Sequence, residues 1–103
     1  MVAYVPDLLD RSKLGAAAAA TFVAEPEQLA GLVGTEDVVV VDLARLGVLE
    51  VLPGLVATGA RVIGFGSHVD RATLEAAAAT GCEAMPRSQF FRSLGALLSP
   101  DAP

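Results

Sequence analysis

Five short apolar runs alternate along the chain with segments whose apolar residues recur at helical spacing. The runs are residues 2–5, 21–24, 38–41, 61–66 and 83–86. Alternation of this kind is typical of stacked βαβ units, in which helices cover both faces of a parallel sheet. The pattern therefore predicts an α/β domain with five strands.

Helical segments are expected after each strand. In chain order they run from near residue 7 to the alanines at 16–20, from residue 25 onward, and over residues 46–58, 70–80 and 88–98. Pro26 suits the first turn of the second helix, because a proline there gives up an amide that has no helical partner. Pro53 lies inside the third helix, so we expect it to bend that helix or to mark its true first turn. Gly81 is a natural terminator for the fourth.

The size and charge of the chain exclude several classes of protein. Its 103 residues suffice for one domain, which we place at residues 1–98 with a frayed tail at 99–103. The formal charge of −5 opposes binding to nucleic-acid phosphates. No apolar run reaches the roughly 18 residues of a membrane span, and no signal peptide is evident, so we expect a cytoplasmic protein. Cys82 is the only cysteine, which excludes an internal disulfide.

Asp42 is the first candidate for chemistry, because it directly follows the most apolar run. The carboxyl ends of parallel strands meet at one edge of the sheet, where ligands gather. Asp7, Ser67 and His68 follow other strands and are expected at the same edge. Asp42 is then a phospho-acceptor, a metal ligand or a carboxylate that accepts hydrogen bonds from loop amides. Asp7 equally suits the N-cap of the first helix.

This succession of strand, acid and helix resembles the receiver domain of response regulators over nearly the whole chain. Residues 2–7 resemble the first strand with its terminal acids, and residues 38–42 resemble the third strand with its phospho-acceptor. Residues 62–70 and 81–90 resemble the regions of the fourth and fifth strands. The resemblance implies a flavodoxin-like three-layer sandwich with a five-stranded parallel sheet in the order 2-1-3-4-5.

The acidic part of the receiver pattern is only half present. Receivers hold Mg²⁺ partly through two adjacent acids after the first strand, and Pro6 stands at the first of these positions. Asp7 and Asp42 are left as possible metal ligands. Mg²⁺ requires nearly octahedral oxygen ligands, so two carboxylates make a poor site. We therefore expect no bound cofactor.

The other receiver positions also depart from the pattern. The hydroxyl residue after the fourth strand aligns with Gly66, although Ser67 could supply a hydroxyl from the next position. The lysine after the fifth strand falls at Arg87 or Ser88. The chain thus resembles a pseudo-receiver, which keeps the scaffold and has lost efficient phosphotransfer.

A candidate interface lies in the last helix. Phe90 and Phe91 are adjacent, and successive side chains on a helix point about 100° apart. Either one ring faces outward, or both pack against neighbouring helices. Receivers commonly associate through the face that includes this helix, so the resemblance makes Phe90, Phe91 and Leu94 possible interface residues.

The sequence leads to three hypotheses for function. We expect a stand-alone receiver-like regulatory domain, not an enzyme, that acts through protein–protein contacts as a homodimer. The second hypothesis is a functional single-domain response regulator that is phosphorylated on Asp42. The third is a small-ligand-binding domain that uses the crevice at the ends of the first and third strands.

Overall fold

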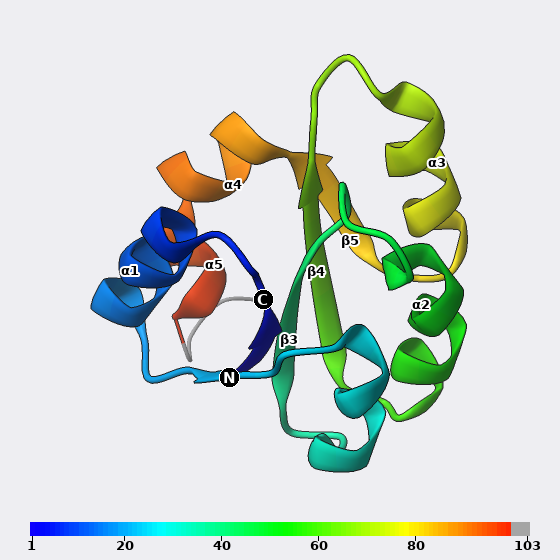
Figure 1. The fold of residues 1–103 in the computed structure, drawn as a ribbon, viewed down its shortest axis with the longest axis horizontal. Helices are drawn as coiled ribbons and strands as arrows, with labels where there is room; N and C mark the ends of the chain where they lie inside the picture. The colour runs from blue at the N-terminus through cyan, green and yellow to red at the C-terminus, as the bar shows by residue number, and fades with distance from the viewer. Residues whose placement is uncertain (100–103) are drawn as a thin grey trace.

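Five parallel strands form one sheet in the order β2-β1-β3-β4-β5 (Figure 1). They are β1 (Val2–Tyr4), β2 (Thr21–Phe22), β3 (Val38–Asp42), β4 (Arg61–Gly66) and β5 (Glu83–Pro86). The structure is a computed structural model that describes residues 1–99, so the part of the expected tail at 100–103 lies outside the described residues. The strand order confirms the predicted flavodoxin-like fold.

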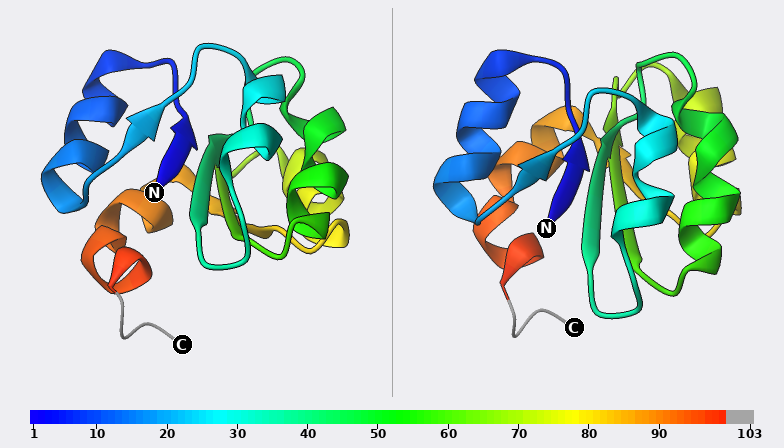
Figure 2. Two further views of the ribbon diagram at one scale, coloured as in Figure 1. Left: turned by 90° about the horizontal axis from the view of Figure 1, so that it is seen from below. Right: turned by 60° about the horizontal axis from the view of Figure 1, so that its bottom comes forward.

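Helices cover both faces of the sheet and complete a three-layer sandwich (Figures 1 and 2). One face carries α1 (Leu8–Ala17), α4 (Arg87–Arg92) and α5 (Leu94–Leu98). The other face carries η1 (Pro26–Gln28), η2 (Ala30–Leu32), α2 (Val48–Ala57) and α3 (Arg71–Ala79). None of the helices in the described residues is long and apolar enough to cross a membrane.

The central strand β3 supplies side chains to two separate apolar clusters. Val39 and Val41 pack with α2 on one face of the sheet, and Val40 packs with α1 and α4 on the other. Successive residues of a strand point to opposite faces, and both faces are covered here. This explains why β3 reads as a continuous apolar run and ends at the first polar residue, Asp42.

The prediction of an α-helix from residue 25 onward is wrong, because residues 26–32 form two short 3₁₀ helices, η1 and η2. The Gln28 side chain accepts hydrogen bonds from the amides of Ala24 and Glu25, which fixes a tight turn at the start. Gly31 lowers the helix propensity of the segment. The fully buried Leu29 anchors the segment in the core, so no regular helix is needed.

Two other helices differ in detail from the prediction. Pro53 lies in the middle of α2, so it does not mark the first turn of that helix. The last predicted helix begins one residue early, at Arg87, and is interrupted at Ser93 to give α4 and α5. The boundary matters because it places Arg87 at the first position after β5.

The two adjacent phenylalanines of α4 both pack against the sheet. Phe65 of β4, Phe90 and Phe91 form a cluster with ring centroids 4.9 to 5.1 Å apart. Phe90 is fully buried and Phe91 is half-buried, so both rings pack against neighbours while Phe91 keeps part of its surface exposed. The cluster fixes α4 on the sheet and thereby places Arg87.

Replacing Phe90 with alanine will remove the centre of this cluster. We expect Phe90→Ala to lower the free energy of unfolding by about 3–5 kcal/mol, the usual cost of truncating a buried phenylalanine. Urea denaturation measures the change. The matched control is Leu46→Ala, which truncates a side chain that is 96% exposed and is expected to change the free energy of unfolding by less than about 0.5 kcal/mol. Equal losses in the two variants would contradict this description of the core.

Candidate functional site

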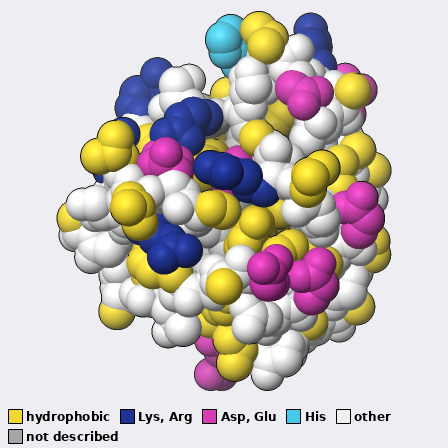
Figure 3. Space-filling view, viewed as in Figure 1, with side chains coloured by type: hydrophobic (Ala, Val, Ile, Leu, Met, Phe, Trp, Pro, Cys, Tyr) yellow, Lys and Arg dark blue, Asp and Glu magenta, His cyan; other side chains and the backbone are white. Residues whose placement is uncertain are grey.

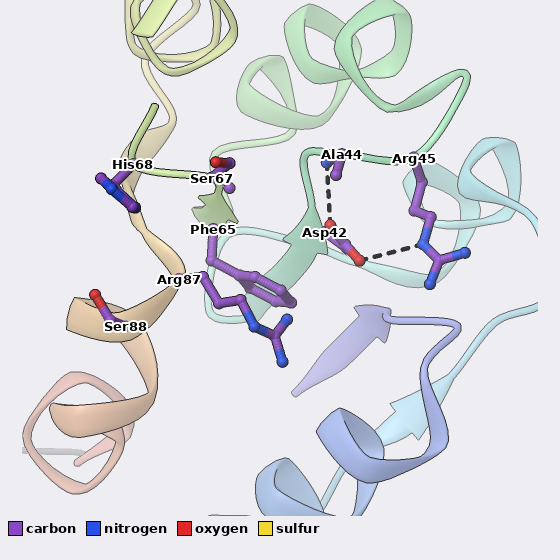
Figure 4. A pocket seen from close by; sticks show the side chains of 9 residues that line it. Asp42, Ala44, Arg45, Phe65, Ser67, His68, Arg87 and Ser88 are labelled. Atoms are coloured by element: carbon purple, nitrogen blue, oxygen red, sulfur yellow. Dashed lines mark hydrogen bonds and ion pairs between the residues drawn. The ribbon is translucent and has the colours of Figure 1, made fainter. Parts of the chain in front are cut away.

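The carboxyl ends of β3, β4 and β5 surround a cavity of about 530 Å³ (Figure 4). The lining residues are Asp42, Ala44, Arg45, Phe65, Gly66, Ser67, His68, Arg87 and Ser88. The cavity therefore lies further along the sheet than the crevice expected between the first and third strands. Five of the residues singled out from the sequence meet here: Asp42, Ser67, His68, Arg87 and Ser88.

The turn after β3 is held tightly against β4. The Leu43 amide donates a hydrogen bond to the Phe65 carbonyl at 2.8 Å. The Leu43 side chain covers Gly64, where an added Cβ would come within 2.7 Å of it. Only glycine allows β4 and Leu43 to approach this closely. The close packing directs the next residues, Ala44 and Arg45, back over the end of β3.

Asp42 is buried at this edge, and both of its carboxylate oxygens accept hydrogen bonds within its own loop. The Ala44 amide donates to Oδ1 at 3.0 Å, and the Arg45 Nε donates to Oδ2 at 3.2 Å (Figure 4). Arg45 was not among the residues predicted from the sequence. Its position three residues after Asp42 is the signal that could have indicated the pair.

Arg87 is held by a second carboxylate that the sequence reading missed. Its two Nη atoms donate to the two oxygens of Asp10 on α1, one of them at 2.7 Å. Asp10 is 1% exposed, so its carboxylate needs such a partner. The hydrogen bond to Asp10 raises the pKa of the Arg87 guanidinium above its usual value, which keeps it fully charged. Arg87 also lies 5.0 Å from the centroid of the Phe91 ring.

Asp7 lies at the same edge, outside the cavity lining, and it caps α1. Its Oδ1 accepts a hydrogen bond from the Asp10 amide at 3.0 Å. That hydrogen bond lowers the pKa of Asp7, and the charges of Arg87 and Arg45 lower it further. Asp7 and Asp42 both act electrostatically on Arg87, so the fold brings the two predicted acids to the same guanidinium.

The oxygens at this edge do not fit Mg²⁺. Among residues 1–99, no three or more His, Cys, Asp or Glu side chains gather closely enough to hold a metal ion. Asp42 is already occupied by an amide and a guanidinium, and the Asp7 carboxylate is used as a cap. Arg45 and Arg87 lie beside these carboxylates, where their guanidinium groups supply hydrogen-bond donors and no ligand atoms for a metal ion. The donor set suits an acceptor-rich group better than a cation.

The remaining polar residues of the cavity come from two loops. The Ser67 hydroxyl accepts a hydrogen bond from the Val69 amide at 3.3 Å and so orders the turn between β4 and α3. His68 and Ser88 are exposed at the cavity edge (Figure 4). Cys82 is buried elsewhere, and burial raises the pKa of its thiol to about 11, so it is not a nucleophile at neutral pH.

The pair formed by Arg87 and Asp10 can be measured by a double-mutant cycle. Arg87→Met will leave the Asp10 carboxylate without its partner and lower the free energy of unfolding by about 1–3 kcal/mol. Adding Asp10→Leu removes the unpaired charge, so the double variant should recover most of this loss. Urea denaturation at neutral pH gives all four free energies. If the losses in free energy of the two single variants add up to the loss in the double variant, the result would contradict the pairing.

Comparison with known proteins adds evidence on the fold. No protein-family model matches the sequence, and no curated protein matches it. One solved structure is similar: a candidate CpaE2 pilus assembly protein from Sinorhizobium meliloti 1021. The two share 21% sequence identity with a TM-score of 0.56, over 90% of this chain and 94% of the other. At this level of identity the similarity shows that the two chains share a fold.

Proposed function

We propose that this chain is a receiver-like regulatory domain that acts through contacts with other proteins and transfers phosphoryl groups poorly or not at all. One observation carries the proposal: the two residues at the acceptor and lysine positions, Asp42 and Arg87, are both engaged inside the protein. Asp42 is held by Ala44 and Arg45, and Arg87 is held by Asp10.

These contacts oppose each requirement of phosphoryl transfer to a carboxylate. The acceptor oxygen must be free to attack, whereas Asp42 has a donor on each oxygen. A metal ion and a nearby cation must offset the charge that develops on the phosphoryl oxygens. The acids near Asp42 are too few for Mg²⁺, and the Asp10 carboxylate neutralises the charge of Arg87.

The similar protein from S. meliloti is described as a candidate pilus assembly protein. A role in assembly is consistent with a domain that works by contact. For this chain, homodimerisation through the face of α4 and α5 stays a prediction. Phe90 is fully buried there, so Phe91 and Leu94, which are half-buried, would have to make the contact.

Incubation with acetyl phosphate and Mg²⁺ tests the proposal. We expect intact-protein mass spectrometry to show no gain of a phosphoryl group, because the acceptor and the cation are already engaged. The matched control is Asp42→Asn under the same conditions. A mass gain in the natural chain that disappears in Asp42→Asn would establish phosphorylation on Asp42 and refute the proposal.

A variant with the receiver pattern restored makes a negative result informative. The changes are Pro6→Asp, Gly66→Ser and Arg87→Lys, together with Arg45→Ala, which removes the guanidinium from Asp42 Oδ2. The Gly66 site accepts a side chain, since an added Cβ would lie 3.5 Å from Leu43 and Leu74, an ordinary contact. We expect this variant to gain a phosphoryl group, and the gain should disappear when Asp42→Asn is added. If the folded variant gains nothing, the replaced residues are not what prevents phosphotransfer.

A further inference from the structure

Four large apolar side chains are exposed at the edge of the sheet that carries the cavity. Leu8 is 76% exposed, Leu9 75%, Leu46 96% and Val69 74%. They come from three places in the chain: the first turn of α1, which follows β1, and the connections that follow β3 and β4. Only one other large apolar side chain in the described residues is exposed to a comparable degree, Leu32.

Each connection places its apolar residue beside the polar site. Leu46 directly follows Arg45, and Val69 directly follows His68, both of which line the cavity. Leu8 follows Asp7, which lies close enough to Arg87 and Arg45 for their charges to lower its pKa. The apolar side chains are therefore the next residues in the chain after residues of the polar site. Exposed apolar groups that gather at one place, with polar groups among them, mark interaction sites in soluble domains.

Arg45 has free hydrogen-bonding capacity directly beside the exposed Leu46. Its Nε is fixed by Asp42, while its terminal Nη atoms have no hydrogen-bond partner among residues 1–99. The side chain is 44% exposed. Asp42 thus holds the guanidinium in place with its free edge toward solvent, which reduces the entropy lost when a carboxylate binds. This gives Asp42 a role as a positioning residue that needs no phosphorylation.

The distribution of charge favours an acidic partner. The chain as a whole carries −5, yet most Lys and Arg side chains on this face gather over α1, α4 and the nearby strand ends, with a few Asp or Glu side chains among them (Figure 3). Asp and Glu side chains gather instead over η1 and α2 on the same view (Figure 3). Arg87 is balanced by Asp10, so at the cavity it is the free edge of Arg45 that attracts carboxylates and repels cations.

We propose that Leu8, Leu9, Arg45, Leu46 and Val69 form a docking surface for an acidic, apolar peptide segment of another protein. A carboxylate of the segment binds the free edge of Arg45, and its apolar side chains cover Leu46 and Val69. The apolar residues lie outside the cavity, so a segment longer than a small metabolite is needed to cover them. This inference rests on the proposed function, because it names the chemistry of the partner.

Selection of random linear peptides displayed on phage tests the docking surface with the full chain as bait. We expect the enriched peptides to combine Asp or Glu with Leu, Ile or Phe. In fluorescence anisotropy, Arg45→Glu and Leu46→Ser should each weaken binding about tenfold or more, as interface anchors do. Asp42→Asn should weaken it less, because Arg45 remains. Binding should also weaken as salt is raised, since the charges are exposed.

Matched controls remove equivalent groups elsewhere. Leu32→Ser removes an exposed leucine from η2, and Arg92→Glu reverses an exposed charge at the end of α4. Both should leave the affinity unchanged, and circular dichroism should show all variants folded. The inference is overturned if no peptide is enriched, or if selected peptides bind Arg45→Glu and Leu46→Ser as tightly as the natural chain.

The inference of a peptide-docking surface would also be overturned if the surface binds a small acid or a second copy of the chain. Full displacement of the peptide by millimolar citrate or glutamate would identify a site for small acids. Conversion of a dimer into a monomer by Leu46→Ser, followed by sedimentation, would identify a self-association surface. The proposed function has its own test, because phosphorylation of Asp42 would refute that function without affecting the docking surface. A chain that is phosphorylated and still binds acidic peptides through Leu46 would refute that function and keep the docking surface.

Discussion

The ion pair between Arg87 and the buried Asp10 determines what the carboxyl edge of this sheet can do. A carboxylate that is 1% exposed needs a strong partner, and the guanidinium of Arg87 fills that role through two hydrogen bonds. The pair joins residues 77 positions apart and ties α4 to α1. A cation used in this way contributes structure, and it no longer offers an unbalanced charge to a transferred phosphoryl group.

The strands could be predicted because β3 and β4 are covered on both faces and read as uninterrupted apolar runs, whereas their order was implied by the resemblance to receiver domains. The structure of residues 25–33 could not be predicted. The start of the segment is typical of an α-helix, but the hydrogen bonds of Gln28 and the burial of Leu29 favour short 3₁₀ turns instead. Asp10 was missed because a single acid near a helix start is normally solvated. Its spacing of four from the fully buried Leu14 places both on one helix face, and that was the available signal. The partner of Asp10, 77 residues away, becomes visible only in the fold.

The two arginines of the site have separate roles. Arg87 is bound to the buried Asp10 and lies over the rings of Phe65 and Phe91, so it links α1 to α4 although about half of its side chain is exposed. Arg45 is fixed at Nε by Asp42 and presents its free edge beside the exposed Leu46. Of the two residues that align with receiver positions, Arg87 is held within the protein by Asp10, and Asp42 orients the side chain of Arg45, which faces solvent.

Titration of Mg²⁺ alone into ¹⁵N-labelled protein, followed by NMR, tests most directly whether the acidic edge is committed to internal contacts. The amide of Ala44 is the reporter, because it donates to Asp42 Oδ1. We predict that millimolar Mg²⁺ leaves its resonance, and those of Arg45 and Asp7, where they are. A saturable shift at Ala44 that is absent in Asp42→Asn would show that Asp42 releases its partners for a metal ion, and would contradict the account.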